Sequence, residues 1–339
     1  MKKVRVEDAV GMVLGHDLTR IVPGEFKGAA FKKGHILKKE DIEELKNMGK
    51  YNIHVFELND DMIHEDEAAM RIAMAATGDG LYLNGPSEGK INIKAKFNGI
   101  LKINLETLSQ INDIEMIMFA TLHNNSVIEK DQTVAGTRII PLVTEVEKIK
   151  EVEKICKNLG KVLSIKEIAP RRVGIVVTGS EVFEGRIKDK FGPVLKKKII
   201  EQGSTLVGIK FSPDNQEKIE ESIMSLVEDG AEIILTAGGM SVDADDVTPN
   251  AIENISDKVI TYGSPVLPGA MFMLTYRKNT PILGIPACGM YFRTTVLDLV
   301  LPRILAGEIL TKKDITSLAH GGLCLGCEVC RYPVCPFGK

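Results

Sequence analysis

The most restrictive feature of this sequence is a regular alternation of apolar runs and amphipathic segments that begins after Pro170. Three runs rich in Val, Ile and Leu have the length of strands, and the two segments between them repeat apolar side chains at helical spacing. The expected strands are 173–179, 204–212 and 231–239, and the expected helices are 193–203 and 215–230. Strands that alternate with helices form βαβ units. The pattern therefore predicts an α/β domain over residues 171–308, built on a doubly wound, mostly parallel sheet.

The size and charge of the chain restrict its class further. A chain of 339 residues exceeds what one hydrophobic core usually covers, so we expect two or three domains. With a net charge of -3, the chain lacks the excess of basic residues that attracts nucleic acid, so we expect no nucleic-acid partner. Charges at Arg5, Glu7 and Asp8 interrupt any apolar leader, and no run of about 20 apolar residues follows. We therefore expect a cytoplasmic protein that does not enter the membrane.

The residues before and after the α/β segment predict further parts. The first part combines short apolar runs with one helical segment, as in a small α+β unit. The second opens with a helix at 65–76, and its alternation of Ile91, Ile93 and Ala95 with polar residues is typical of a half-buried strand. The order and spacing of its predicted strands and turns are similar to those of a small β-sandwich of the barrel-sandwich hybrid type. The predicted domains are 1–67 (α+β), 68–144 (β module), 145–170 (linker helix), 171–308 (α/β) and 309–339 (cysteine-rich tail).

Polar and glycine-containing turns follow each predicted strand of the α/β segment. Ligands of an open α/β sheet bind at the carboxyl ends of its strands, so these turns form the first candidate site. They contain Thr178-Gly179-Ser180-Glu181, then Asp214, then Gly238-Gly239-Met240-Ser241 followed by Asp243, Asp245 and Asp246. A Gly-Gly turn lets the backbone approach an anion, a helix beginning near Thr248-Pro249 offers N–H groups to phosphate, and carboxylates are ligands of Mg²⁺. The chain lacks both G-x-G-x-x-G after a strand and a complete P-loop, which sets those two nucleotide-binding families aside.

The order of these motifs resembles the molybdopterin-binding domain of molybdenum-cofactor biosynthesis proteins, which include molybdopterin adenylyltransferase and molybdenum insertase. The resemblance covers about 171–306 and rests on VVTGSEV, GRIKDKFGPVL, LTAGGMSVDADDVTP and GIPACGMYFRTTVLDLVLPRIL. It implies a pocket for molybdopterin or molybdenum cofactor, with Asp189 and Asp246 as catalytic residues that organise Mg²⁺ while AMP moves from ATP to molybdopterin. The residues implied to bind the cofactor are Thr178, Gly179, Ser180, Glu181, Asp214, Gly238, Gly239, Met240, Ser241, Pro268, Gly269 and Pro286.

The resemblance also reaches the start of the chain and implies self-association. Residues 28–57 are similar to part of the insertase, and the family implies a homo-oligomer, trimeric in adenylyltransferases and dimeric in insertases. The insertase turn Lys-Pro-Gly-Lys-Pro, however, is replaced by Pro265-Val266-Leu267-Pro268-Gly269-Ala270-Met271, which lacks both lysines. Two hypotheses therefore stand: a transferase of adenylyl groups or molybdate, and a non-catalytic carrier or sensor that delivers finished cofactor to a molybdoenzyme.

The end of the chain predicts a metal centre. Cys324, Cys327, Cys330 and Cys335 give the spacing C-x₂-C-x₂-C-x₄-C-P, close to the ferredoxin spacing C-x₂-C-x₂-C-x₃-C-P. Four thiolates in so short a segment wrap one ion or cluster when glycines permit tight turns. The consecutive spacing and the trailing Pro336 favour an Fe–S cluster over Zn²⁺, and both are kept as alternatives. In ferredoxins the fourth ligand is remote, so Cys335 or Cys288 is the candidate for that position.

Overall fold

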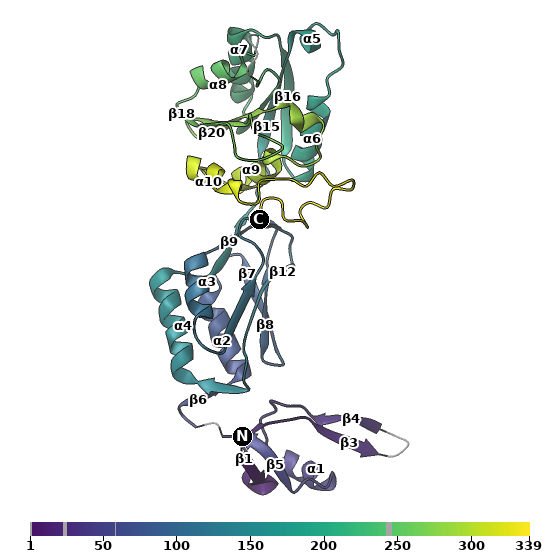
Figure 1. Ribbon diagram of the computed structural model, residues 1–339, viewed down its shortest axis with the longest axis vertical. Coiled ribbons are helices and arrows are strands. Elements are labelled where there is room, and N and C mark those ends of the chain that lie inside the picture. Colours follow the sequence, from purple (N-terminus) through teal and green to yellow (C-terminus); the bar gives the residue numbers. More distant parts are fainter. Residues whose placement is uncertain (1, 23–25, 58, 242–245) are drawn as a thin grey trace. The chain divides into compact units, whose positions relative to one another are not determined.

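The computed structural model describes residues 2–22, 26–57, 59–241 and 246–339 (Figure 1). Contacts within the chain divide it into two units, Met1–Lys166 and Glu167–Lys339. No helix among the described residues is both long enough and apolar enough to cross a lipid bilayer. Each unit has hydrophobic cores of its own.

Unit 2, residues 167–339, is built on one six-stranded sheet in the order β16-β15-β17-β20-β19-β18. Its strands are β15 (Arg172–Thr178), β16 (Thr205–Ser212), β17 (Ile233–Ala237), β18 (Lys258–Tyr262), β19 (Met273–Arg277) and β20 (Thr280–Ile285). β15 pairs in parallel with β16 and β17, and β17 pairs in parallel with β20. β19 is antiparallel to both β20 and β18. The predicted α/β domain with a largely parallel sheet is confirmed, with β19 as an antiparallel addition.

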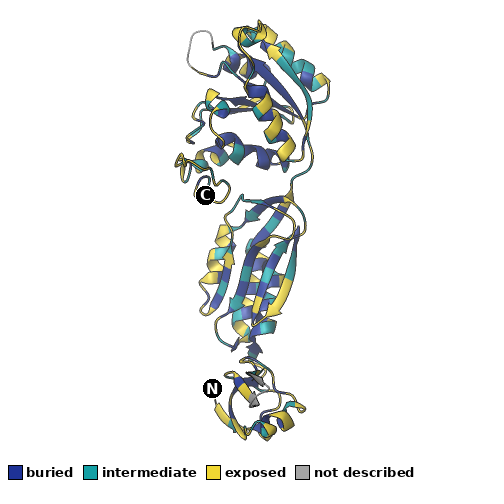
Figure 2. Cartoon of the chain, turned by 90° about the vertical axis from the view of Figure 1, so that its right-hand side faces the viewer, coloured by how far each residue is buried: buried dark blue, intermediate teal, exposed yellow. Residues whose placement is uncertain are grey.

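Helices cover both faces of this sheet, which is why its central strands are almost wholly apolar (Figure 2). Val173, Ile175 and Val177 of β15 pack with the helices 191–201 and 296–305 on one face, while Val176 packs with the helices 216–228 and 248–254 on the other. The helices are α5 (Ser180–Phe183), α6 (Phe191–Glu201), α7 (Gln216–Glu228), α8 (Thr248–Asn254), α9 (Val296–Leu305) and α10 (Lys312–Thr316), with 3₁₀ turns η2 (Ala287–Met290) and η3 (Ser317–Ala319). Alternate side chains of one strand thus serve two cores.

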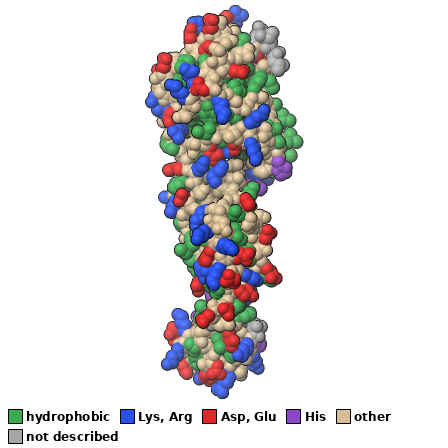
Figure 3. All heavy atoms as spheres, turned by 90° about the vertical axis from the view of Figure 1, so that its left-hand side faces the viewer, with side chains coloured by type: hydrophobic (Ala, Val, Ile, Leu, Met, Phe, Trp, Pro, Cys, Tyr) green, Lys and Arg blue, Asp and Glu red, His purple; other side chains and the backbone are tan. Residues whose placement is uncertain are grey.

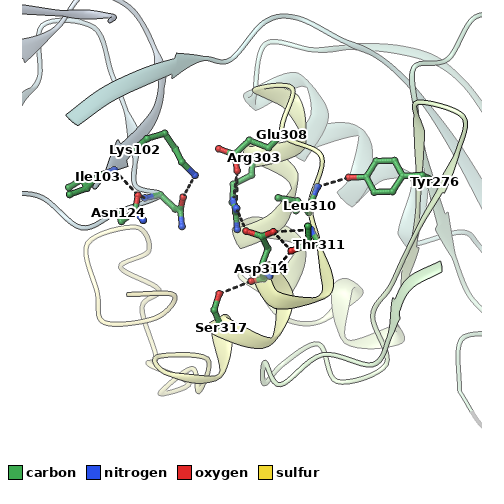
Figure 4. Close-up of polar contacts among 11 residues, drawn as sticks. Lys102, Ile103, Asn124, Tyr276, Arg303, Glu308, Leu310, Thr311, Asp314 and Ser317 are labelled. Carbon is green, nitrogen blue, oxygen red and sulfur yellow. Dashed lines mark hydrogen bonds and ion pairs between the residues drawn. The ribbon is translucent and has the colours of Figure 1, made fainter. Parts of the chain in front are cut away.

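A buried arginine joins α9 to α10 (Figure 4). Arg303 donates to Glu308 Oε2 at 2.9 Å and to Asp314 Oδ1 at 2.7 Å, and both Arg303 and Glu308 are buried. Burial by itself raises the pKa of Asp314, but hydrogen bonds from Thr311 and Arg303 outweigh it and lower that pKa to about 2. The segment that leads into the cysteine-rich tail is therefore fixed by charge-assisted hydrogen bonds.

The first part of unit 1 has a small core of its own. It contains β1 (Lys2–Arg5), η1 (Val6–Asp8), β2 (Val13–Leu14), β3 (Leu18–Val22), β4 (Phe26–Phe31), α1 (Asp41–Asn47) and β5 (Asn52–Phe56). β1, β5 and β2 form an antiparallel sheet, and β3 pairs with β4 in a hairpin. Leu14, Leu45 and Val55 are fully buried between these elements. On the face shown in Figure 3, basic and acidic side chains are interspersed.

The rest of unit 1 packs helices against antiparallel strands. Its elements are β6 (Met62–His64), α2 (Glu65–Ala76), β7 (Leu81–Ser87), β8 (Lys90–Ala95), β9 (Gly99–Ile103), α3 (Leu105–Asn112), β10 (Ile117–Thr121), β11 (Val127–Ile128), β12 (Thr133–Ile139), β13 (Val143–Glu145), α4 (Val146–Leu159) and β14 (Leu163–Glu167). The main sheet has the order β10-β12-β8-β7, and a smaller one has the order β11-β9-β14. The half-buried strand predicted at Ile91, Ile93 and Ala95 is confirmed as β8.

The predicted β-sandwich is wrong, because α2, α3 and α4 share the core with the strands (Figure 1). Ile149, Val152 and Cys156 lie on one face of α4 at helical spacing and are buried in that core, so α4 is part of the module and not a free linker. Helix α3 was not predicted from the sequence; its start is capped by Asn104, which accepts from the Thr107 N–H at 3.2 Å.

Candidate functional site

The site is placed by a reversal of strand order in unit 2. The chain leaves β15, forms its neighbour β16 on one side, and then crosses to form β17 on the other side. A crevice opens at such a reversal, outside the carboxyl ends of the strands. Thr178, Ser212 and Ala237 are the last residues of these three strands, and the turns that follow them are the turns singled out from the sequence.

The Gly238-Gly239 turn is packed so tightly that only glycine fits. Gly238 has φ +102, and a Cβ there would lie 2.2 Å from the carbonyl oxygen of Thr178. Gly239 has φ +55, and a Cβ there would lie 2.6 Å from Thr248 Oγ1. The buried hydroxyls of Thr178 and Thr248 are 3.0 Å apart and hydrogen-bonded. These contacts join the end of β15, the turn after β17 and the start of α8.

Ser180 and Asp214 lock the neighbouring turns together. The Ser180 N–H donates to Asp214 Oδ2 at 2.8 Å, and the Asp214 N–H donates to Ser180 Oγ at 3.1 Å. The Gly179 N–H also donates to the Ser212 carbonyl at 3.1 Å. Glu181 is exposed on the first turn of α5, with its carboxylate beside Gly179. The reciprocal pair holds the turn after β15 to the turn after β16, so Ser180 and Asp214 shape this edge of the site.

Both expected catalytic carboxylates accept hydrogen bonds from backbone N–H groups in this structure. Asp246 Oδ2 accepts from the Ser241 N–H at 2.8 Å and so holds the residue that follows the glycine turn. Asp189 Oδ1 accepts from the N–H groups of Phe191 at 2.7 Å and Gly192 at 3.1 Å, and so caps the start of α6. Asp243 and Asp245 lie outside the described residues.

The remaining expected residues lie at or near the same edge of the sheet. Pro286 directly follows β20, which runs parallel to β17, and Met240 packs against Gly284 of β20. Pro268 and Gly269 precede β19, and β19 begins at this edge because it runs antiparallel to β20. The backbone of Gly269 lies close to α9, since a Cβ there would be 2.5 Å from Val296 Cγ1.

Cys288 lies on η2, just after Pro286. Burial raises the pKa of its thiol, which keeps it protonated at neutral pH. A protonated thiol is a weak metal ligand and a weak nucleophile. Nothing in this geometry therefore singles out Cys288 for chemistry.

The four tail cysteines line one cavity of about 450 Å³, together with the segment 291–294. All four are free thiols. Among the described residues, no three Cys, His, Asp or Glu side chains meet closely enough to hold a single metal ion. The pKa of the Cys330 thiol is lowered, first by its hydrogen bond with Thr294 and then by the backbone N–H of Tyr332.

Several residues at these two sites were not identified from the sequence. The role of the Thr248 side chain was missed, although the helix start at Thr248-Pro249 was expected. Tyr262 was also missed; its hydroxyl donates to the Met240 carbonyl at 3.0 Å and so supports the glycine turn. At the cavity, Thr294 and Tyr332 were missed because their contacts to Cys330 and to Asp298 join segments far apart in the chain.

Two family descriptions match parts of the chain. Residues 174–306 match a family described as a probable molybdopterin binding domain, and residues 3–57 match a domain of unknown function, DUF8806. The first match covers nearly the same residues as the resemblance seen in the sequence and confirms it.

Curated relatives match a shorter stretch of the chain. A CinA-like protein from Mycobacterium leprae (strain TN) is 34% identical over 91 residues, which are 27% of this chain and 21% of that protein. A CinA-like protein from Mycobacterium tuberculosis (strain ATCC 25618 / H37Rv) is 37% identical over 81 residues, 24% of this chain and 19% of that protein. The chain thus spans about a fifth of the length of these curated relatives.

Solved structures of similar proteins were also found. The molybdopterin biosynthesis enzyme MoaB from Thermus thermophilus is 22% identical, with a TM-score of 0.36 over 41% of this chain and 98% of that one. MogA is 23% identical, with a TM-score of 0.35 over 40% of this chain and 99% of that one.

Proposed function

We propose that this protein binds molybdopterin or molybdenum cofactor and acts in the biosynthesis or handling of that cofactor, since residues 174–306 match the family described as a probable molybdopterin binding domain. The observation that carries the proposal is the Gly238-Gly239 turn, packed against Thr178 and Thr248 at the point where the strand order reverses. Only glycine fits both positions of this half-buried turn, and a turn of this kind can bind a phosphate through its backbone N–H groups.

The binding proposal assigns separate parts of the ligand to separate groups. The backbone N–H groups around Gly238 and Gly239 would hold the terminal phosphate, since amide groups of a glycine turn form an anion-binding concavity. The turns at Pro268-Gly269 and Pro286 would contact the pterin, because they lie along the same sheet edge beside β20. Ser180 and Asp214 would keep the wall of the pocket in place through their reciprocal hydrogen bonds.

Adenylyl transfer is the first activity to test. It would move AMP from ATP to the terminal phosphate of molybdopterin and release pyrophosphate, with Mg²⁺ supplying charge neutralisation between the phosphates. Asp246 is the better placed of the two expected carboxylates, because its Oδ2 holds Ser241 while its Oδ1 accepts from no backbone N–H of the described residues. Asp189 shares both oxygens with the start of α6, so we assign it to positioning.

A carrier or sensor of finished cofactor is the second candidate. Two observations favour it: Asp189, Asp214 and Asp246 all hold backbone N–H groups, and no lysine is present in the turn 265–271. Such a protein would bind tightly and release its ligand unchanged to a molybdoenzyme. Self-association as a dimer or trimer and a cytoplasmic location remain part of this proposal.

One experiment separates the two candidates. The purified protein is incubated anaerobically with molybdopterin and Mg-ATP, and bound and released pterins are identified by mass spectrometry. Adenylylated product establishes transfer, and Asp246→Asn should then reduce turnover far more than binding. Bound but unchanged pterin establishes the carrier, and absence of bound pterin overturns the proposed function. Gly185→Ala is a suitable control, since a Cβ at that exposed glycine meets no atom within 4 Å.

A further inference from the structure

The tail of unit 2 forms a second candidate site that is separate from the glycine turn. Residues 323–337 and the segment 291–294 enclose a cavity of about 450 Å³. Cys324, Cys327, Cys330 and Cys335, the four cysteines after residue 320, are all part of its lining. We call it the cysteine cavity.

The tail is anchored to the folded domain on both sides of the cavity. Before the cavity, the Leu267 N–H donates to Gly322 O and the Cys324 N–H donates to Leu267 O, both at 2.8 Å. After it, Phe337 is buried in the core beneath the sheet, and the Gly338 N–H donates to Gly321 O at 2.9 Å. The cysteine segment is thus a closed loop fixed at both ends and not a free chain end.

The middle of the loop has a different character. Leu325 and Val329, on either side of Cys327, are each 72% exposed, and Cys327 is exposed as well. Exposure of these apolar side chains to water does not stabilise the folded chain. The loop ends are fixed by the protein, while the segment that carries the second cysteine is largely open to solvent.

The wall of the cavity offers donors and positive charge near sulfur. Thr294 Oγ1 lies 3.3 Å from Cys330 Sγ, and the Tyr332 hydroxyl donates to the Asp298 carbonyl at 3.0 Å, which fixes the chain just after Cys330. Arg293 and Arg331 also line the cavity. Cationic side chains and hydrogen bonds to sulfur stabilise the negative charge of thiolate-ligated iron.

We propose that the cysteine cavity is the site of an iron–sulfur cluster ligated by Cys324, Cys327, Cys330 and Cys335. All four cysteines line this cavity. Their C-x₂-C-x₂-C spacing and the trailing Pro336 are close to the ferredoxin pattern, which favours a cluster over a single Zn²⁺. A cluster takes up more volume between its ligands than one ion does, and the cavity of about 450 Å³ offers that volume.

The cavity also has a backbone connection to the candidate pterin pocket. Leu267 pairs with Leu323 of the tail and stands two residues before Gly269. In this extension, which rests on the proposed function, a bound cluster holds the turn 267–269 in place for the pterin. Loss of iron would then weaken pterin binding, whereas the cluster itself does not depend on the pterin.

The test begins with iron and acid-labile sulfide in the full-length protein, purified anaerobically and reconstituted with ferrous iron and sulfide. About two to four irons per chain with a matching amount of sulfide are expected, together with a thiolate-to-iron absorption band. The single variants Cys324→Ser, Cys327→Ser, Cys330→Ser and Cys335→Ser should each lower the iron content at least several-fold. Cys156→Ala and Cys288→Ser, which change cysteines outside the cavity, should retain the iron content of the unchanged protein.

Each other outcome overturns a defined part of the proposal. Stoichiometric zinc without sulfide in the anaerobic protein, or iron that survives all four cavity substitutions, rejects the cluster. Loss of iron in Cys288→Ser with retention in Cys335→Ser rejects Cys335 as the fourth ligand. If the protein binds iron as expected but its pterin affinity is the same in the iron-loaded and iron-free forms, only the extension is rejected. If the iron-loaded protein binds no pterin, only the proposed function is rejected.

Discussion

The glycine turn and the cysteine loop of unit 2 are organised in opposite ways. The turns after β15, β16 and β17 are fixed by contacts among themselves, through Thr178 with Thr248 and Ser180 with Asp214. The cysteine loop is fixed at its ends, through Leu267 and Phe337, while its middle is exposed. The difference leads us to expect that the turns of the first site hold their shape without a ligand, whereas the middle of the cysteine loop would be fixed only by the proposed cluster.

The largest effect is expected at the anchor of the cysteine loop. Phe337 is 3% exposed and packs in the core shared with α9 and β20. Phe337→Ala should lower the free energy of unfolding of unit 2 by about 3–5 kcal/mol, measured by denaturant unfolding. Val334→Ala, at a side chain 81% exposed in the same loop, should change it by less than about 0.5 kcal/mol. Equal effects would show that the loop is not anchored as described.

The next effect tests whether the glycine turn is formed in advance. Gly238→Ala places a Cβ 2.2 Å from the Thr178 carbonyl and demands a left-handed backbone, so we expect a loss of about 2–3 kcal/mol in the free energy of unfolding. Pterin affinity, measured by titration calorimetry, should fall at least tenfold. Gly185→Ala has a similar backbone requirement at φ +74 but no clash, and should cost about 1 kcal/mol without loss of affinity. Unchanged pterin binding in Gly238→Ala would contradict the site.

An acid titration tests the ion pairs at the base of the cysteine loop. The pKa of Asp314 is about 2 in the folded protein, against 3.8 for an aspartate without these partners, so its contribution is present above pH 4 and is lost as the pH falls from about 4 to about 2. Allowing for screening of this partly exposed carboxylate by solvent, the shift corresponds to about 1–2 kcal/mol of stability. The stability difference between the unchanged protein and Asp314→Asn should therefore shrink over that interval. If this stability difference stays constant from pH 4 to pH 2, the ion pair of Arg303 with Asp314 does not support the loop.

The smallest effect is expected at the reciprocal pair of the first site. Ser180→Ala removes the oxygen that accepts from the Asp214 N–H, and we expect a loss of about 1 kcal/mol in the free energy of unfolding. Ser222→Ala is the matched control, because Ser222 Oγ donates to the Lys218 carbonyl on the exposed surface of α7. If Ser180→Ala is as mild as Ser222→Ala in both stability and pterin affinity, the pair does not shape the pocket.

The α/β domain was predictable because two of its properties are local. Strands buried on both faces appear in the sequence as short continuous apolar runs, as at Ile175, Val176 and Val177, and the turns of the candidate site follow the strands directly. The glycine turn is likewise visible within a few residues.

Other features were not predictable because they depend on pairings between distant segments. The β-sandwich interpretation failed since α4 gives the same local pattern whether its apolar face meets a sheet or a partner, and only the fold places Val152 against α2 and the strands. The contact of Thr178 with Thr248 joins residues 70 positions apart, and that of Cys330 with Thr294 joins residues 36 apart. Asp189 and Asp246 were predicted by position, but their hydrogen bonds to backbone required the structure.

The closed end of the cysteine loop has a chemical consequence. With Gly338 hydrogen-bonded to Gly321, the four thiols are confined at a high effective concentration relative to one another. In the proposed site, binding of iron by one thiolate would make binding by the other three intramolecular, and release of the cluster would require several thiolates to dissociate together. The same confinement applies to oxidation: in air, the four free thiols should form disulfides within the loop faster than between molecules, and a reductant would then be needed before a cluster could be assembled there.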